Sequence, residues 1–440
     1  MFFSRNRVFA CFISGKVLYN QGDGASRVSP AKCVPPFGKG KGMPRFSQTE
    51  RNILQIIRRR GQLSRADLSR LSGLSPTTIL DATSTFKAMR LIEVSQSESR
   101  GGRRPMRIKL RDDLAHALGI DLGTNFVRAV VTDMNGTIVS SHKAEREPFN
   151  YSRLKVPDIE GVAATALVKA RKRKEDLAVI GIGITGFINE AEKKCLFLNK
   201  VPEWTDFPVA DHYARVFGNP HIAVKDSVNA MAFAEKQLGS CRDEENFVYI
   251  AIGMGLGSSI YVNARPLMSR YGISGEIGHI DISQNESICC CGNRGCLESS
   301  ASGWAVVKRC KEALDTGVVS SLNSVTDTMN LTVKDIIDAA HTGDKLSTSL
   351  IRESAREIAI GISVMINILN PNKIVLSGGI VRGAGDLFLA PLKAEVHAHV
   401  LPWLQKNIEF SLSGLGEYDS ATGSALVALD EYFFEILDGN

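Results

Sequence analysis

The stretch GEIGHIDISQNESICCCGNRGCLE, residues 275–298, places one histidine and four of the chain's nine cysteines within 24 residues. Three of these thiols, Cys289, Cys291 and Cys296, have the spacing C-x-C-x4-C, and His279 lies ten residues before the first of them. Three thiolates and one imidazole are the ligands of a closed tetrahedral zinc site, in which no position is left for water. We therefore predict a structural zinc ion (Zn²⁺) in the loop 279–296.

Two other interpretations of the same stretch are a redox pair and a core rich in sulfur. Both are less favoured, because a core rarely needs cysteines at ligand spacing beside a histidine. Gly292 and Gly295 would let the chain fold tightly around the metal. Cys290 is expected to point away from it, since neighbouring residues in an extended segment face opposite sides.

Length and composition set limits on the class of protein. The chain has 440 residues, which is too long for one compact core and predicts two or three domains. No apolar run approaches the roughly 18 residues that cross a bilayer, so we expect a cytoplasmic protein with no membrane partner. Thiols stay reduced in that compartment, which favours metal binding over disulfides.

The net charge of +6 is distributed unevenly along the chain. Residues 1–42 carry +6, residues 43–110 carry +9 and residues 111–440 carry −9. A basic front on an acidic body indicates a nucleic-acid-binding module joined to a second function. Residues 1–42 are rich in Gly, Pro and Lys, so we expect a disordered basic extension; Met43, which precedes patterned sequence, is an alternative start.

The sequence after Gln48 predicts three short helices. An apolar face in the first helix ends at Gly61, and Ser64 is placed to cap the second. Gly73 then makes a turn, and Ser75 caps a third helix. This order is typical of a helix-turn-helix whose third helix enters the major groove. The apolar face of the first helix consists of Ile53, Leu54, Ile56 and Ile57.

The segment LIEVSQSESRGGRRPMRIKL, residues 91–110, predicts two strands joined by a Gly/Arg tip, which together form a wing. With it, residues 43–110 become a winged helix-turn-helix that binds a double-stranded DNA operator. Arginines at the tip suit a minor groove or phosphates, namely Arg100, Arg103 and Arg104. The candidate base readers are Thr77, Thr78, Leu80 and Asp81, while Ile79, Thr83 and Phe86 should face the core. Further phosphate contacts are expected from Arg58, Arg59 and Arg60.

Residues 111–440 repeat a pattern of strand, glycine turn and strand followed by helices, which predicts two α/β lobes of related build facing a cleft. The turns DLGT (121–124), GMGLG (253–257) and SGG (377–379) can present backbone amides to phosphates. Each is weak alone, but together they begin to resemble the nucleotide loops of the actin and sugar-kinase fold. The candidate loop residues are Asp121, Gly123, Gly253, Gly255, Gly378 and Gly379.

Taken together, E-x-G-H followed by C-x-C-G-x-x-G-C-x-E resembles the signature of the ROK family of sugar-responsive repressors and sugar kinases. The resemblance covers residues 43–435 and includes Trp204 and the segment VKDSVNAMAFAE, residues 224–235. It implies an α/β fold, in which an N-terminal winged helix-turn-helix precedes a two-lobed actin-like, sugar-kinase body. The winged helix resembles that of the repressor branch.

The family resemblance also implies a sugar site, lined by Asp226, Asn229, Glu276, His279 and Glu298. Carboxylates suit a sugar because each accepts from vicinal hydroxyls, while His279 can bind sugar through one ring nitrogen and zinc through the other. In the family's kinases, the aspartate that matches Asp226 is the base that takes the proton from the attacking hydroxyl. Asp226 would be catalytic only in that case; its other interpretations are a helix cap or a salt bridge.

Departures from the kinase pattern fall in the phosphate loops. Where the kinases have D-x-G-G-T-K, residues 121–126 read DLGTNF, and G-T-G becomes Gly253-Met254-Gly255. Phosphoryl transfer depends on positioning and on charge stabilisation, so these losses should impair it. Lys225 replaces the asparagine before the catalytic aspartate, and Thr185 replaces the proline of P-G.

We therefore expect a transcriptional regulator rather than an enzyme, with a sugar or sugar phosphate as effector. The alternative is an ATP-dependent kinase of hexoses or N-acetylhexosamines that requires Mg²⁺; a zinc-stabilised structural role without a ligand is a third. Helix-turn-helix proteins bind two half-sites, which predicts a homodimer or a dimer of dimers.

Overall fold

The computed structural model describes residues 10–13, 16–19, 46–96, 106–123, 126–145, 158–198, 201–267, 269, 272–281, 286–324 and 331–438. The chain separates into two units, residues 1–32 and 33–440. In the first unit, β1 (Ala10–Ile13) and β2 (Lys16–Tyr19) pair antiparallel. None of the helices in the described part of the chain has the length and apolarity that crossing a membrane requires.

The second unit begins with the winged helix, built from α1 (Gln48–Arg60), α2 (Arg65–Ser72), α3 (Pro76–Ala88), β3 (Ile92–Gln96) and β4 (Met106–Leu110). The predicted caps are confirmed: Gly61 ends α1, Ser64 caps α2 and Ser75 caps α3. Gly73 has a left-handed backbone (φ 70°), which a residue without Cβ adopts without strain. β3 and β4 pair antiparallel as the wing, whose tip, with Arg100, Arg103 and Arg104, lies outside the described residues.

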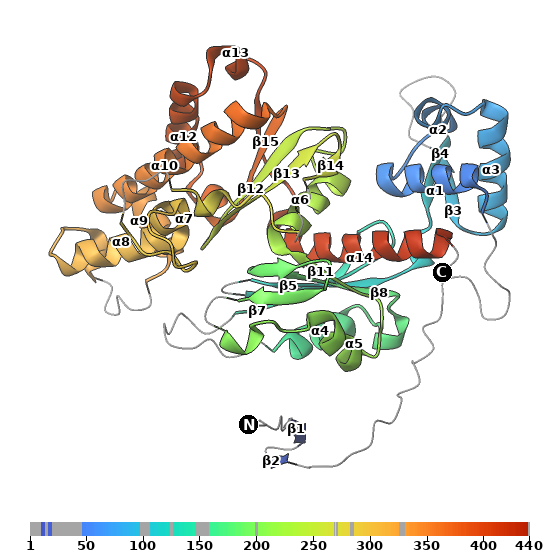
Figure 1. The fold of residues 1–440 in the computed structure, drawn as a ribbon, viewed down its shortest axis with the longest axis horizontal. Helices are drawn as coiled ribbons and strands as arrows, with labels where there is room; N and C mark the ends of the chain where they lie inside the picture. The colour runs from blue at the N-terminus through green and yellow to red at the C-terminus, as the bar shows by residue number, and fades with distance from the viewer. Residues whose placement is uncertain are drawn as a thin grey trace, which may run out of the picture. The chain divides into compact units, whose positions relative to one another are not determined.

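Two five-stranded sheets form the body (Figure 1). The first has the order β11-β8-β5-β6-β7, from β5 (Ala117–Leu122), β6 (Phe126–Thr132), β7 (Ile138–Glu145), β8 (Val179–Ile184) and β11 (Ile222–Asp226). The second has the order β14-β13-β12-β15-β16, from β12 (Phe247–Ile252), β13 (Leu256–Val262), β14 (Arg265–Pro266), β15 (Lys373–Ser377) and β16 (Glu409–Leu412). In each sheet a central strand pairs antiparallel on one side and parallel on the other. The prediction of two lobes of related build is therefore confirmed.

The first sheet has helices on both faces. Its apolar side chains pack against α4 (Ile159–Lys169) and α5 (Val209–Phe217). Glycines face α14 (Asp419–Asp438) on the other side: a Cβ on Gly119 would lie 1.9 Å from Ala421 O, and one on Gly181 would lie 1.8 Å from Ser424 O. The helix backbone therefore rests directly on β5 and β8. Figure 1 shows α14 along one face of this sheet, with α4 and α5 on the opposite face.

The second lobe has a separate core between its sheet and a group of helices. These are α7 (Leu297–Ala301), α8 (Gly303–Asp315), α9 (Val333–His341), α10 (Lys345–Leu369), α11 (Gly379–Ala384), α12 (Asp386–His399) and α13 (Pro402–Gln405). On the other face, α6 (Ser227–Leu238) packs against β12 and β13 and also against α14. A small hairpin, β9 (Phe187–Asn189) and β10 (Lys194–Phe197), completes the body.

Candidate effector and DNA-binding sites

The four predicted metal ligands lie together. The ligand atoms of His279, Cys289, Cys291 and Cys296 are all within 4.8 Å of one another, so the group could hold a metal ion. Nδ1 of His279 is 3.6 Å from the Cys289 sulfur, and the Cys291 and Cys296 sulfurs are 3.7 Å apart. The histidine ring therefore points its Nδ1 at the thiols and its Nε2 away from them.

The loop that carries these cysteines turns at glycines, as predicted. Gly292 and Gly295 both have left-handed backbones, with φ of 91° and 74°. Cys290 is exposed and is not one of the four clustered ligands, but its sulfur lies 3.6 Å from Oε1 of Glu298. Together with Cys289 these two residues form a second, smaller group of metal-ligand type. That group has three ligands where the first has four.

Asp226 lies at the end of β11 and caps α6. Its Oδ1 accepts from the backbone N–H groups of Val228 (2.9 Å) and Asn229 (3.0 Å). Burial, together with the neighbouring Glu276 and Glu190, raises the pKa of Asp226 to about 7 against the lowering effect of the two backbone hydrogen bonds. The helix-cap interpretation is thus correct for Oδ1, while no hydrogen bond between described residues reaches Oδ2.

The second lobe supplies the opposite wall of this site. Nε2 of His279 lies 3.9 Å from Oε2 of Glu276, on the side of the ring away from the thiols. Glu298, at the start of α7, accepts from the Leu256 backbone N–H through Oε2 at 2.8 Å. A Cβ on Gly278 would lie 2.3 Å from Leu256 O, so the glycine of the E-x-G-H segment allows it to approach β13. The metal cluster and the carboxylates are therefore parts of one wall.

One residue of this region was missed in the sequence: Glu190, directly after β9. Its side chain is 7% exposed and pairs with Lys225, with Nζ 2.5 Å from Oε2. Its Oε1 also accepts from the Asn229 side-chain amide at 3.4 Å. A lone glutamate in a turn carries no pattern that would have identified it.

The candidate nucleotide loops lie at the ends of β5, β12 and β15. Asp121 is buried, and both its oxygens are engaged: Oδ2 accepts from Arg128 at 2.9 Å and Oδ1 from Ser420 at 2.8 Å. At the second loop, Gly253 O accepts from the Gly303 backbone N–H at 2.8 Å. Gly378 has φ of 108° and packs against β12, and Gly379 begins α11. Thr124 and Asn125 lie outside the described residues.

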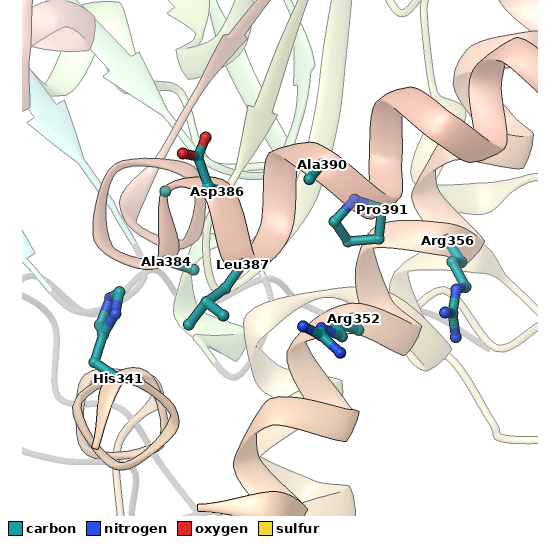
Figure 2. Close-up of a pocket in the computed structure, with 9 residues that line it drawn as sticks. His341, Arg352, Arg356, Ala384, Asp386, Leu387, Ala390 and Pro391 are labelled. Carbon is teal, nitrogen blue, oxygen red and sulfur yellow. The ribbon is translucent and has the colours of Figure 1, made fainter. Parts of the chain in front are cut away.

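A hollow of about 640 Å³ lies elsewhere, among α9, α10 and α12 (Figure 2). Arg352 and Arg356 project from α10 beside Pro391, and Asp386 points away from them (Figure 2). None of its lining residues belongs to the group around Asp226 or to the metal cluster. The hollow is therefore separate from the candidate sugar site.

On α3, the division between core-facing and exposed residues is as predicted except at Thr78, which was expected to be exposed. Ile79, Thr83 and Phe86 are buried, while Thr77, Leu80 and Asp81 are exposed. Thr78 is half-buried, and its hydroxyl lies 2.8 Å from the Ser75 hydroxyl at the N-cap. Leu80, at 45% exposure, is the large apolar side chain of this face.

The expectation that Arg58 contacts DNA phosphates is wrong. Its guanidinium is buried against the body, donating to Met134 O at 2.9 Å and to Leu426 O at 3.3 Å. Asp430 of α14 lies 3.6 Å from its Nε. Burial lowers the pKa of Arg58, and the nearby Asp430 partly offsets that effect.

The two following arginines also contact the body. The Arg59 guanidinium lies 5.3 Å from the centre of the Phe434 ring. Arg60 pairs with Asp243 and donates to Arg242 O at 3.2 Å. The basic end of α1 therefore fastens the winged helix to the body.

A winged helix fastened to a two-lobed α/β body defines a class of DNA-binding protein that carries a second, larger module. Residues 46–93 match the model of the winged helix-turn-helix DNA-binding family, and residues 117–431 match that of the ROK family. The chain belongs to the ROK family. The resemblance expected from the sequence is thereby confirmed.

Curated relatives and solved structures agree with this assignment. A xylose repressor of Bacillus spizizenii is 28% identical over 88% of this chain and 95% of its own length. A glucokinase of Halalkalibacterium halodurans is 31% identical over 68% of this chain and 90% of its own. A solved structure that matches is the crystal structure of a ROK family transcriptional regulator, described as a homologue of the E. coli Mlc protein. The match covers 89% of this chain and 97% of that regulator's chain, with a TM-score of 0.69 and 25% identity.

Proposed function

We propose that this protein is a sugar-responsive DNA-binding transcriptional repressor of carbohydrate-metabolism genes. It acts in the cytoplasm, and a small sugar in the cleft of the body changes its affinity for an operator. The observation that carries this conclusion is the attachment of the winged helix, through Arg58, to the body that holds Asp226 and its neighbouring carboxylates. The match over both regions to a xylose repressor supports it. The chain would divide into an extension (1–42), a winged helix (43–110) and a body (111–440).

The metal in the Cys/His cluster is proposed to be zinc with a structural role. Ligands of a tetrahedral zinc ion at ~2.3 Å Zn–S and ~2.0 Å Zn–N are separated by ~3.5–3.8 Å. The separations of 3.6 Å between His279 Nδ1 and the Cys289 sulfur and 3.7 Å between the Cys291 and Cys296 sulfurs fit this geometry. When bound, the ion would fix the ring of His279 so that Nε2 faces the sugar.

The sugar is proposed to lie between Asp226 and the wall formed by the second lobe. Asp226 Oδ2, Glu276 and the Nε2 of His279 would bind its hydroxyls, with further contacts from Asn229 and Glu298. Glu190 adds another carboxylate to the same region. Such a concentration of negative charge favours a neutral sugar over a sugar phosphate at this end of the cleft.

DNA contacts are proposed for the exposed face of α3 and for the wing. On α3 these are Thr77, Thr78, Leu80 and Asp81, and on the wing Arg100, Arg103 and Arg104. Two winged helices would engage two half-sites of a palindromic operator, so a homodimer is the expected functional form.

A two-part experiment tests the proposal. Thermal-shift measurements with D-xylose, D-glucose and N-acetyl-D-glucosamine should identify a sugar that raises the melting temperature by mass action. Fluorescence anisotropy with the promoter fragment of the protein's own gene should then show sequence-selective binding that this sugar weakens. Protein that binds this fragment no better than random DNA, with or without sugars, would contradict the proposal.

The kinase alternative is less well supported. Asp121, at the first phosphate loop, is occupied by Arg128 and Ser420 and is not open to a Mg²⁺–ATP complex. Phosphoryl transfer also needs charge stabilisation that the substituted loops lack. ADP release with a sugar, ATP and Mg²⁺ that is abolished by Asp226→Asn would establish this alternative.

A further inference from the structure

The loop of the β9–β10 hairpin, residues 190–193, contacts the candidate sugar site at its first residue. The buried Glu190 carboxylate pairs with Lys225 through Oε2 and accepts through Oε1 from the Asp226 backbone N–H and the Asn229 side-chain amide, both at 3.4 Å. Bonds of this length are weak. A sugar hydroxyl can therefore replace these donors at little cost.

The same hairpin also touches the second lobe. The Phe187 ring, in β9, lies 5.7 Å from the His279 ring, measured between centroids. Gly272 has φ of 80°, and a Cβ placed on it would be 3.1 Å from Glu190 Cγ. The segment that leads to Glu276 thus rests on the Glu190 side chain. A ligand that draws Asp226 and the second lobe closer together must therefore change the contact between Gly272 and Glu190.

At its last residue, the loop contacts the helix that holds the winged helix. Lys193 donates to Ile222 O at 2.8 Å, and its Nζ lies 3.7 Å from Oε2 of Glu431 in α14. The preceding residue of α14 is Asp430, the partner of Arg58 in α1. The hairpin loop and the winged helix therefore bind adjacent residues of one helix.

We propose that Glu190 senses the bound sugar and that the loop 190–193 passes the change to α14 and so to the winged helix. A hydroxyl that donates to Glu190 Oε1 displaces the donors from Asp226 and Asn229 and moves the carboxylate. Lys193, three residues later in the same loop, then shifts on Glu431. The sugar is a neutral one with adjacent hydroxyls, because Glu190 and Asp226 must both accept from it. The inference rests on the proposed function.

Two pairs of variants of the full-length protein test this relay. Lys193→Met removes the contact with α14 and is matched by Lys194→Met, since the ion pairs of Lys194 among the described residues are with Glu192 and Asp206 of its own lobe. Glu190→Gln is matched by Glu192→Gln in the same loop. The measured quantities are the sugar dissociation constant, by calorimetry with the sugar identified in the thermal-shift panel, and the operator dissociation constant with and without that sugar. The coupling ratio is the operator dissociation constant with the sugar divided by that without it, and it should be about 5- to 150-fold in the wild type.

Lys193→Met should keep the sugar dissociation constant within about twofold of the wild-type value. It should lower the coupling ratio about two- to fivefold, as expected for the loss of one exposed ion pair. Lys194→Met and Glu192→Gln should change neither quantity. Glu190→Gln should lower the ratio below about a third of the wild-type value; if it fails to fold, the double variant Glu190→Gln/Lys225→Met removes the whole pair and should do the same.

Other outcomes overturn the inference. Lys193→Met and Lys194→Met could both bind the sugar and have the same coupling ratio. That result would show that the hairpin does not relay the signal, and it would leave the proposed function intact. Failure of every sugar in the panel to bind the wild type would overturn the proposed function and, with it, this inference.

Discussion

Replacing Arg58 with methionine should detach the winged helix from the body. The guanidinium makes two hydrogen bonds to backbone carbonyls and an ion pair with Asp430, whose side chain is 17% exposed. Removing one partner of such a buried group costs about 3–5 kcal/mol, because the other charge is left unpaired in a site of low polarity. Methionine keeps most of the packing of the arginine stem, so the loss reports the polar contacts.

Hydrogen exchange of the α1 amides is a suitable assay, because a chain of several domains does not unfold in two states. A loss of about 3–5 kcal/mol corresponds to exchange about 10² to 4 × 10³ times faster, at about 1.4 kcal/mol for each factor of ten. Arg60→Met is the matched control, since its partner Asp243 has an 88% exposed side chain and such a pair contributes less than about 1 kcal/mol. Arg58→Met/Asp430→Leu should recover most of the protection, because both charges leave together.

The result that would refute this reasoning is simple to recognise. If Arg58→Met and Arg60→Met accelerated exchange in α1 by the same factor within about threefold, the buried contacts would not fasten the winged helix. The same conclusion would follow if the double variant exchanged as fast as Arg58→Met alone.

Three further predictions concern the body. Asp226 has a folded pKa of about 7 against an ordinary value of about 3.9, so its contribution to stability is present below pH ~4 and is lost as the pH rises through about 7. Asp226→Asn should reduce the change of the melting temperature with pH between pH 5 and 8. The same pH dependence in the variant and the wild type would contradict the assignment. Cys296→Ser, or chelation, should abolish the sugar-induced thermal shift before α-helical content is lost, as followed by calorimetry and circular dichroism; an intact sugar response would separate the metal from the sugar wall. Gly181→Ala should destabilise the first lobe by about 3 kcal/mol in chemical denaturation, because the new Cβ meets Ser424 O, whereas Gly414→Ala, with open space around it, should be nearly neutral.

The features that could be predicted from the sequence depend on neighbouring residues along the chain. Ser64, Gly73 and Ser75 set the ends of α2 and α3 because caps and left-handed turns act over three or four residues. The metal cluster was predictable for a similar reason: three of its ligands lie within eight residues, and the fourth, His279, lies only ten residues before the first of them.

The features that could not be predicted depend on contacts between distant segments. In the sequence Arg58 is one of three consecutive arginines, and only its contact with α14, nearly 370 residues later in the chain, shows that it is buried. Glu190 is an ordinary acidic residue of a turn until the hairpin folds over β11 and places it beside Lys225. Arg128 belongs to a regular strand, and its occupation of Asp121 follows from strand pairing.

The packing of α14 also has a consequence for synthesis of the protein. The ribosome completes β5 and β8 early, yet the helix whose backbone rests on Gly119 and Gly181 is the last described element of the chain. Domains generally fold as they emerge, beginning at the N-terminus, but here the first lobe and the anchor for Arg58 are incomplete until α14 has been synthesised. A chain cut short by a late stop codon would therefore release a winged helix without its attachment, and an incomplete repressor could not hold its DNA-binding domain in place.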